Sequence, residues 1–253
     1  MSARTILITG ATGKIGRVLV RHFLAAGDCV IAAGRTQVRL DDLAREEIGQ
    51  PGQLATVPVD LCASEAVPAL VARLDSIGLR PDCLINNARS LDYLAVGADG
   101  MAARGNFLGE LTLDVVVPYE LVMALANMPS SRLRSVVNIG SQYGGVAPNL
   151  RLYDDPVRQS PVQYGVAKAA LEHLTRELAV RLADRGIRVN CVAFGGVEGR
   201  VDEAFRKRYA ALCPSGRMLG EHELPGPVDL LLSDDASAIT GHVLRADGGW
   251  TAW

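Results

Sequence analysis

Short runs of apolar and β-branched residues alternate along the chain with longer segments in which apolar residues recur every three or four positions. The short runs predict strands, at residues 4–9, 29–33, 54–59, 82–85, 135–139, 187–193 and 242–245. The longer segments predict amphipathic helices, at residues 14–26, 36–49, 64–77, 105–128 and 162–184. Each helix that follows a strand must cross a face of the sheet to reach the next strand. We therefore expect a doubly wound α/β fold, with a parallel sheet of about seven strands and helices on both faces.

The alternation continues over all 253 residues without a change in composition, so we expect one domain spanning 1–253. Three stretches are least regular, at residues 86–104, 142–161 and 194–222. In such a fold the loops at the carboxyl ends of the strands form the ligand crevice. We expect 142–163 to be an inserted substrate loop and 194–222 to be a lid region on the substrate side.

Charge and composition exclude several classes of partner. The 26 basic and 28 acidic residues are spread along the chain and give a net charge of −2, so no basic block predicts a nucleic-acid partner. There is no apolar run of about 18 residues and no leader pattern, which predicts a soluble cytoplasmic protein without a membrane segment. Five scattered cysteines without a C-x-x-C pair fit a reducing compartment. The four histidines have no ligand spacing, so no metal is expected.

The segment Thr9 to Gly16, with the sequence TGATGKIG, ends the first expected strand and opens the first expected helix. Its glycines, Gly10, Gly13 and Gly16, permit a tight turn and a close backbone approach. The N-terminus of the helix then offers free N–H groups to a pyrophosphate. The spacing differs from the general dinucleotide pattern G-x-G-x-x-G, and a purely structural turn is the alternative. Its place after the first strand favours a Rossmann-type nucleotide site.

Four further motifs follow in order, Asn86-Asn87-Ala88, Ser141, Tyr164-Gly165-Val166-Ala167-Lys168 and Asp247-Gly248-Gly249-Trp250. With the glycine turn they make the chain similar, over essentially its whole length, to the short-chain dehydrogenase/reductase family. The resemblance implies an NAD(P)-dependent oxidoreductase that interconverts a carbonyl and an alcohol group on a small molecule. It also implies a homo-oligomer, a dimer or a tetramer, packed through the segments 105–128 and 162–184.

The resemblance assigns roles to individual residues. Tyr164 is expected to give or take the substrate proton, Lys168 to assist it, and Ser141 to hold the substrate oxygen. Tyr164 and Lys168 stand four positions apart, which places them on the same face of a helix, where the ammonium favours the phenolate. Taken alone, such a pair is more often a surface feature. The residues implied in cofactor binding are Gly10, Thr12, Gly13, Lys14, Ile15, Gly16, Arg35, Asp60, Leu61, Asn87, Ala88, Tyr164, Lys168, Gly195 and Val197.

Three positions depart from the family pattern. Asp114, four residues before Pro118, stands where the family usually has an asparagine that helps a water chain reach the lysine. We count Asp114 as a candidate catalytic residue, and a solvated helix position is the alternative. Arg89 stands where glycine is common, and Phe194 replaces the proline that usually precedes Gly195. Neither change removes a reacting group.

The distance from Ser141 to Tyr164 is 23 positions, which is longer than in most family members. The intervening stretch contains several polar residues, Asn149, Arg151, Tyr153, Asp154, Asp155 and Arg158. They predict a loop that selects a sugar-like or anionic substrate, and charges that only pair with one another on the surface are the alternative.

The sequence on both sides of this loop resembles the branch of flagellin-modification dehydrogenases, which serve the sugar pathways of surface glycosylation. Three other functions compete. A 3-oxoacyl-thioester reductase is one alternative. A nucleotide-sugar epimerase or dehydratase is disfavoured, because the chain has no room for the further C-terminal domain of those enzymes. A non-catalytic NAD(P)-binding regulator is disfavoured too, because Tyr164 and Lys168 are both present.

The end of the second strand predicts the choice of cofactor. An acidic residue there would bind the ribose 2′-hydroxyl of NAD, whereas this chain has Gly34 followed by Arg35, whose guanidinium suits a 2′-phosphate. Lys14 adds a second positive charge, although both side chains could simply be solvated. We expect NADP(H) to be favoured, with NAD(H) possible.

Overall fold

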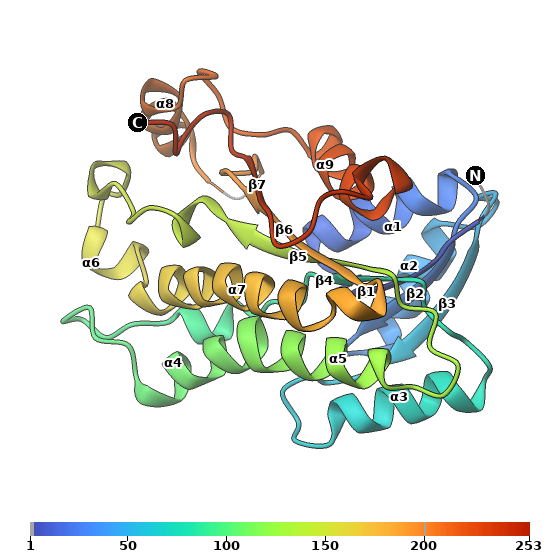
Figure 1. The fold of residues 1–253 in the computed structure, drawn as a ribbon. Coiled ribbons are helices and arrows are strands. Elements are labelled where there is room, and N and C mark those ends of the chain that lie inside the picture. The colour runs from blue at the N-terminus through green and yellow to red at the C-terminus, as the bar shows by residue number, and fades with distance from the viewer. Residues whose placement is uncertain (1–2, 200) are drawn as a thin grey trace.

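The computed structural model describes residues 3–199 and 201–253, which form a seven-stranded parallel sheet covered by helices (Figure 1). The strand order is β3-β2-β1-β4-β5-β6-β7, and every neighbouring pair is parallel. The strands are β1 (Thr5–Thr9), β2 (Cys29–Gly34), β3 (Gln53–Pro58), β4 (Cys83–Asn86), β5 (Ser135–Ser141), β6 (Arg188–Phe194) and β7 (Val243–Ala246). The predicted doubly wound Rossmann-type fold is confirmed.

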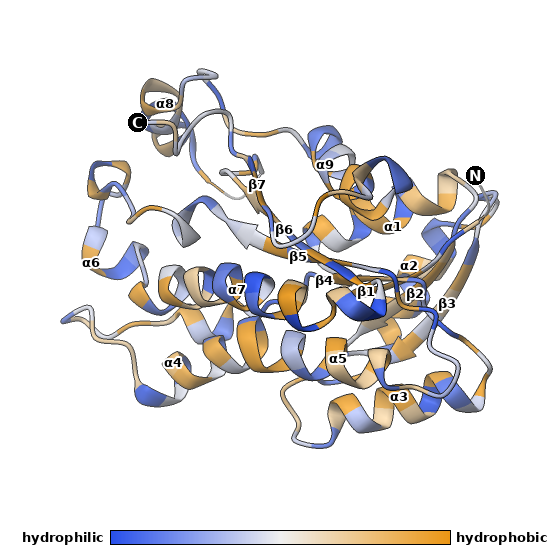
Figure 2. Cartoon of the chain, in the orientation of Figure 1, coloured by the Kyte–Doolittle hydropathy of each residue, from blue (hydrophilic) through white to orange (hydrophobic). Residues whose placement is uncertain are grey.

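The sheet is buried on both faces because its strands are nearly continuous apolar runs, whose successive side chains point to opposite faces. In β1, Ile6 and Ile8 belong to one core cluster and Leu7 to the other. The first cluster lies under α1 (Lys14–Ala25), α2 (Gln37–Glu46) and α9 (Pro225–Leu232). The second lies under α3 (Ala66–Ser76), α5 (Val117–Ala126) and α7 (Val162–Arg181). Figure 2 shows the resulting contrast, with hydrophobic colour along the strands and mixed colour on the helices.

The sequence order of the strands reverses direction between β1 and β4. In doubly wound sheets the ligand crevice forms at this point, outside the carboxyl ends of the strands. The glycine turn follows β1 and the Asn-Asn-Ala motif ends β4, so the sheet brings two of the expected cofactor segments together here. The site of this protein is therefore set by the strand order.

The expected helix 105–128 is present but consists of three joined segments. They are α4 (Arg104–Leu111), a π-helical turn (Thr112–Val116) and α5. Pro118 has no N–H to bond the carbonyl of Asp114, so the regular ladder cannot continue and the turn widens. The candidate residue Asp114 lies inside this π-helical turn.

The second half of the chain contains elements that the periodic pattern did not predict, namely α6 (Pro156–Gln159), α8 (Glu203–Leu212) and α9. A third apolar cluster joins the two irregular regions, with Leu152, Tyr209, Cys213, Met218 and Trp250 at its centre. Leu152 is fully buried. The stretch 142–163 is therefore not only a polar loop, because one side of it is held against α8 by apolar packing.

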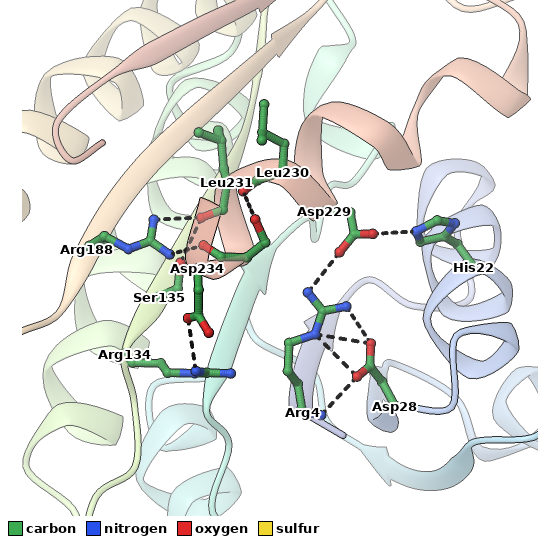
Figure 3. A network of polar contacts seen from close by, with 11 residues as sticks. Arg4, His22, Asp28, Arg134, Ser135, Arg188, Asp229, Leu230, Leu231 and Asp234 are labelled. Carbon is green, nitrogen blue, oxygen red and sulfur yellow. Dashed lines mark hydrogen bonds and ion pairs between the residues drawn. The ribbon is translucent and has the colours of Figure 1, made fainter. Parts of the chain in front are cut away.

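The amino ends of the strands are closed by a polar network (Figure 3). Arg4 at the start of β1 binds Asp28 at 2.6 Å and Asp229 of α9 at 2.8 Å, and His22 of α1 also contacts Asp229. The hydrogen bonds from His22 and Arg4 lower the pKa of Asp229 below its usual range, although burial opposes them. This end of the sheet is thus tied by ion pairs, which leaves the carboxyl end as the site of ligand binding.

Within the described residues, no helix is both long enough and apolar enough to cross a bilayer.

Candidate active site

The glycine turn has the geometry of a phosphate cradle. Gly10 has a positive φ of 62°, and a Cβ atom there would lie 2.7 Å from the Cα of Ala88. A Cβ on Gly16 would lie 2.3 Å from the carbonyl oxygen of Gly10, so a side chain cannot be accommodated at either position without a shift of the backbone. Gly13 is the N-cap of α1, where no side chain caps the helix and the first turn contains no acidic residue. The free N–H groups at this end fit a dinucleotide pyrophosphate.

The Asn-Asn-Ala motif is clamped onto this turn. The side-chain amide of Asn87 donates to the carbonyl oxygens of Thr9 at 2.9 Å and Gly10 at 3.2 Å. The backbone N–H groups of Asn87 and Ala88 both donate to the Thr9 hydroxyl. Asn87 therefore fixes the position of the turn in this structure, which is a structural task in addition to the cofactor contact implied by the family resemblance.

The candidate residues for the adenosine end lie around β2 and β3. The Arg35 guanidinium is exposed at the end of β2, 3.5 Å from Asp92, and Asp60 is exposed and accepts from the N–H of Cys62. Hydrogen bonds from Ser90 and Arg35 lower the pKa of Asp92, so Arg35 has an anionic neighbour. The Lys14 ammonium lies 3.7 Å from the carboxylate of Glu221. Both basic residues thus have acidic neighbours that a 2′-phosphate would compete with.

The remaining candidates lie close to these segments. Leu61 is buried in the second apolar cluster, and Ile15 packs against the first. The side chain of Thr12 approaches Gly34, where a Cβ atom would lie 3.3 Å from it. Gly195 follows β6 and bonds to Ala246 of β7, and Val197 pairs with Leu219 in an isolated bridge.

Lys168 and Asp114 form the buried centre of the site. The Lys168 ammonium lies 3.0 Å from Oδ1 of Asp114 and also donates to the carbonyl oxygen of Ile139, at 3.0 Å. The two residues are 5% and 3% exposed. Burial alone favours the neutral amine, but the Asp114 carboxylate outweighs it and raises the pKa of Lys168. The alternative that Asp114 is a solvated helix residue is wrong.

Tyr164 lies one helical turn before Lys168, whose Nζ atom is 5.8 Å from the centre of the tyrosine ring. The Arg89 guanidinium lies over the same ring, 4.3 Å from its centre. Among the described residues, Arg89 makes no ion pair and no hydrogen bond. Arg89, which stands where the family commonly has glycine, therefore places an exposed positive charge beside Tyr164, the residue expected to exchange the proton.

Ser141 lies at the end of β5, where its hydroxyl accepts from the N–H of Tyr143 at 3.2 Å. The ring of Tyr143 meets that of Tyr164 edge to face, with 6.4 Å between the centres. The Tyr143 hydroxyl is 2.9 Å from that of Tyr153 in the inserted loop. Burial raises the pKa of both Tyr143 and Tyr153, so these two hydroxyls stay protonated near neutral pH. Tyr153 is thus linked to Tyr164 through Tyr143, a second tyrosine of the same loop.

An open pocket of about 290 Å³ lies between the inserted loop and α8. It is lined by Tyr153, Asp154, Gln159, Val201, Asp202, Phe205 and Arg208. Arg208 is tied to the loop by a 3.1 Å ion pair with Asp154 and a 2.7 Å hydrogen bond to the carbonyl oxygen of Leu152. The two arginines singled out from the sequence lie elsewhere. Arg158 lies near Asp155, at 3.7 Å, and Arg151 is exposed.

Sequence reasoning missed Tyr143, Arg208 and Glu110. Glu110 is a buried residue of α4, one turn before Asp114. Only Glu110 had a usable signal, because its spacing of four from Asp114 predicts a shared helix face. Arg208 and Tyr143 depend on packing that brings distant segments together. Across 3–199 and 201–253, no three His, Cys, Asp or Glu side chains are grouped so that they could hold a metal ion.

Comparison with known proteins agrees with this geometry. Residues 10–251 match the family model described as enoyl-(acyl carrier protein) reductase. An uncharacterized short-chain type dehydrogenase/reductase of Sinorhizobium fredii is 34% identical over 98% of this chain, which spans 43% of that relative. L-xylulose reductase of Bos taurus is 31% identical, with 100% of this chain and 98% of that protein covered. The post-translational flagellin modification protein A of Campylobacter coli is 26% identical, with 98% of each covered.

Solved structures give the same result. A short-chain dehydrogenase of Leptospira borgpetersenii with bound NAD+ has a TM-score of 0.85 and 27% identity, covering 98% of this chain and 93% of that one. The RhlG–NADP complex of Pseudomonas aeruginosa has a TM-score of 0.84 and 26% identity, covering 98% and 97%. The chain belongs to the short-chain dehydrogenase/reductase family. It is an NAD(P)-dependent oxidoreductase acting on CH–OH groups.

Proposed function

We propose that the protein interconverts the carbonyl and alcohol forms of a small polar substrate of sugar type, with NADP(H) as the preferred cofactor. The main support is the position of Tyr153. Its hydroxyl reaches Tyr164 through Tyr143, and its ring lines the polar pocket between the inserted loop and α8. A substrate whose reacting oxygen lies at Tyr164 would extend its distal part toward this pocket.

The proton chemistry follows from the positions of three side chains. The hydroxyl of Ser141 holds the substrate oxygen, and Tyr164 exchanges a proton with it. The ammonium of Lys168 stays charged because it is paired with Asp114, and its field favours the phenolate of Tyr164. The glycine turn would hold the pyrophosphate of the dinucleotide, and Asn87 and Lys168 would lie on its nicotinamide side; when bound, this cofactor would supply or accept the hydride.

The chemistry of the pocket supports a sugar-like substrate. Its aromatic members, Tyr153 and Phe205, lie 5.7 Å apart in a tilted pair and offer a flat apolar surface. Asp154, Gln159 and Arg208 surround them with hydrogen-bond acceptors and donors. Sites for long acyl chains are lined mainly by apolar side chains with few polar groups. The resemblance to a flagellin modification protein supports a place in the synthesis of a surface glycan.

The preference for NADP(H) rests on Arg35. Its guanidinium follows β2 at the place where an acidic residue would bind a ribose 2′-hydroxyl, and it is exposed. Asp92 holds this guanidinium loosely, at 3.5 Å, so a doubly charged phosphate would displace the contact.

We also propose that residues 142–163 act as the substrate loop and 194–222 as the lid region of one domain spanning 1–253, and that the protein is a homo-oligomer. Exposed apolar side chains gather on the two expected interface segments. They are Leu108, Val116 and Tyr119 of 105–128 and Val162, Val166 and Val180 of 162–184.

A 3-oxoacyl-thioester reductase is the second candidate, favoured by 28% identity to the 3-oxoacyl-[acyl-carrier-protein] reductase of Thermotoga maritima over 98% of each chain. Consumption of NADPH with L-xylulose and with acetoacetyl-CoA distinguishes the two. We expect turnover of L-xylulose or of a related ketose and little turnover of the thioester, with Tyr164→Phe as the inactive control. Efficient turnover of the thioester alone would replace the sugar-type proposal by the second candidate. Turnover that survives in Tyr164→Phe would refute the proposed chemistry.

A further inference from the structure

Glu110 is a carboxyl group that the chemistry described above does not use. It lies in α4, is 1% exposed, and neither of its carboxyl oxygens has a hydrogen-bond partner among the described residues. A buried ionised carboxylate without a partner is strongly disfavoured, so such a group takes up a proton instead. Glu110 is well placed for this, because it lies one helical turn before Asp114 on the same face.

The charged groups around Glu110 come from three elements. Asp114 belongs to its own helix, Arg89 to the connection after β4, and Lys168 to α7, which packs against α4. Burial is the largest influence and raises the pKa of Glu110 to about 7, with the negative charge of Asp114 adding to it and the two cations opposing it. The second oxygen of Asp114 and Oε1 of Gln163 are also buried without a partner in the described part of the chain. The interior around the Lys168–Asp114 pair therefore contains more carboxyl and amide oxygens than it has partners for among the described residues.

We propose that Glu110 is a positioning residue that holds a proton behind the Lys168–Asp114 pair and, through Asp114, controls how strongly the lysine acts on Tyr164. This inference rests on the catalytic roles proposed above for Lys168 and Tyr164. With its proton, Glu110 is neutral, and Asp114 is the only negative charge facing the lysine from this helix. Without it, two carboxylates face one ammonium, and the lysine favours the phenolate of Tyr164 less.

The consequence is a second ionisation in the pH dependence of the reaction. As the pH rises through the range in which Glu110 loses its proton, its negative charge opposes formation of the Tyr164 phenolate. The rise of alcohol oxidation with pH is then displaced upward. A neutral amide at position 110 removes this effect because it cannot lose a proton. It also keeps nearly the shape of the protonated acid, so the packing is preserved.

The test compares Glu110→Gln with Glu120→Gln, which makes the same chemical change on the exposed side of α5. For the free protein without cofactor, infrared difference spectra between pH 5.5 and 8.5 should show a protonated carboxyl band that titrates near neutral pH. We expect this band in the wild type and in Glu120→Gln but not in Glu110→Gln. A band that persists in Glu110→Gln, or no band in any of the three, would overturn the inference. If Glu110→Gln does not fold, the absence of a titrating band from the wild-type spectrum still overturns the inference.

The second readout is the pH profile of kcat/KM for alcohol oxidation, with any alcohol that the wild type turns over. In Glu110→Gln the midpoint should move down by about one pH unit, and in Glu120→Gln it should not move. A profile equal to the wild type, in an enzyme that Tyr164→Phe inactivates, would overturn the role of Glu110 and leave the proposed function intact. If Tyr164→Phe stayed active, the proposed function would fail, whereas the infrared titration would still report the proton on Glu110.

Discussion

The Lys168 ammonium and the Asp114 carboxylate form a buried ion pair, 3.0 Å apart, between the long helix α7 and the π-helical turn before α5. Lys168 has a second partner in the carbonyl oxygen of Ile139 at the end of β5. The lysine is thus fixed from two sides at the carboxyl edge of the sheet. A buried ammonium needs such partners to remain charged, and a charged lysine is what the proposed proton exchange at Tyr164 requires.

Substitution of Asp114 should separate the charge of this residue from its packing. Asp114→Asn keeps an acceptor for Lys168 and removes a negative charge that opposes the Tyr164 phenolate, so the enzyme should fold and, as long as Lys168 stays charged, its pH–rate profile should move to lower pH. Asp114→Leu leaves the ammonium buried without an anionic partner, which should cost about 3–5 kcal/mol of unfolding free energy. Urea unfolding and pH profiles measure the two effects. Equal stability of Asp114→Leu and the wild type would show that the pair is not the fixed element described here.

Tyr164 and Lys168 should respond differently to removal. Tyr164→Phe keeps the ring and loses the proton-exchanging hydroxyl, so turnover should fall by roughly 10²–10⁴-fold while NADP(H) affinity stays nearly unchanged. Lys168→Ala should reduce both turnover and cofactor affinity, because we expect this lysine to contact the nicotinamide ribose as well. Fluorescence titration with NADPH, together with initial rates, separates the two variants. If Tyr164→Phe kept most of the wild-type turnover, another group would have to supply the proton.

The sheet was predictable because each of its strands has a local signal, whereas α6, α8 and α9 had none that the periodic pattern revealed. Buried parallel strands are short apolar runs, and the helices that cover them are amphipathic, so their order specifies the sheet. The joined helix 105–128 is a case in which the signal was incomplete. Pro118 indicated an interruption, but it did not show whether the chain would bend, end or widen into a π-helical turn, nor that Asp114 in this turn would meet Lys168. That contact joins residues 54 positions apart.

The candidate site was predictable only where its residues belong to ordered motifs. Tyr164, Lys168, Ser141 and the glycines were found because their spacing is characteristic. Tyr209 was not, although it is 1% exposed, stacks on Trp250 at 4.5 Å and donates to the side chain of Gln142. No local pattern marks it, because its partners come from the turn after β5 and from the end of the chain. The inserted loop was likewise expected to be only polar, since the burial of Leu152 depends on α8.

Arg35 should decide the choice of cofactor. Arg35→Ala removes the only guanidinium at the end of β2, and we expect it to lower kcat/KM for NADPH by about tenfold, a typical loss for one charged hydrogen-bonding partner. The value for NADH should change little, because NADH has no 2′-phosphate. Arg39→Ala, on the exposed face of the following helix, is the matched control. Equal or better use of NADH by the unmodified enzyme would reverse the proposed preference.

We expect Arg208, which contacts the inserted loop from α8, to contribute to substrate binding. Its guanidinium lines the pocket, donates to the carbonyl oxygen of Leu152 at 2.7 Å and is only partly exposed, so it orients the loop and faces the pocket at the same time. Arg208→Ala should raise KM for L-xylulose or another polar ketose by about five- to tenfold, with a smaller effect on kcat, because the reacting groups are unchanged.

The controls come from arginines that do not line the pocket. Arg206 pairs with Glu203 on the exposed face of α8, and Arg206→Ala should leave KM unchanged. Arg151→Ala and Arg158→Ala test the earlier expectation that these loop residues bind an anionic substrate. Because Arg158 lies near Asp155 and Arg151 is exposed, we expect effects on KM below about twofold for an anionic sugar as well as for a neutral one. If all four variants had the same KM as the wild type for polar ketoses, the pocket between the loop and α8 would not be the place where the substrate is selected.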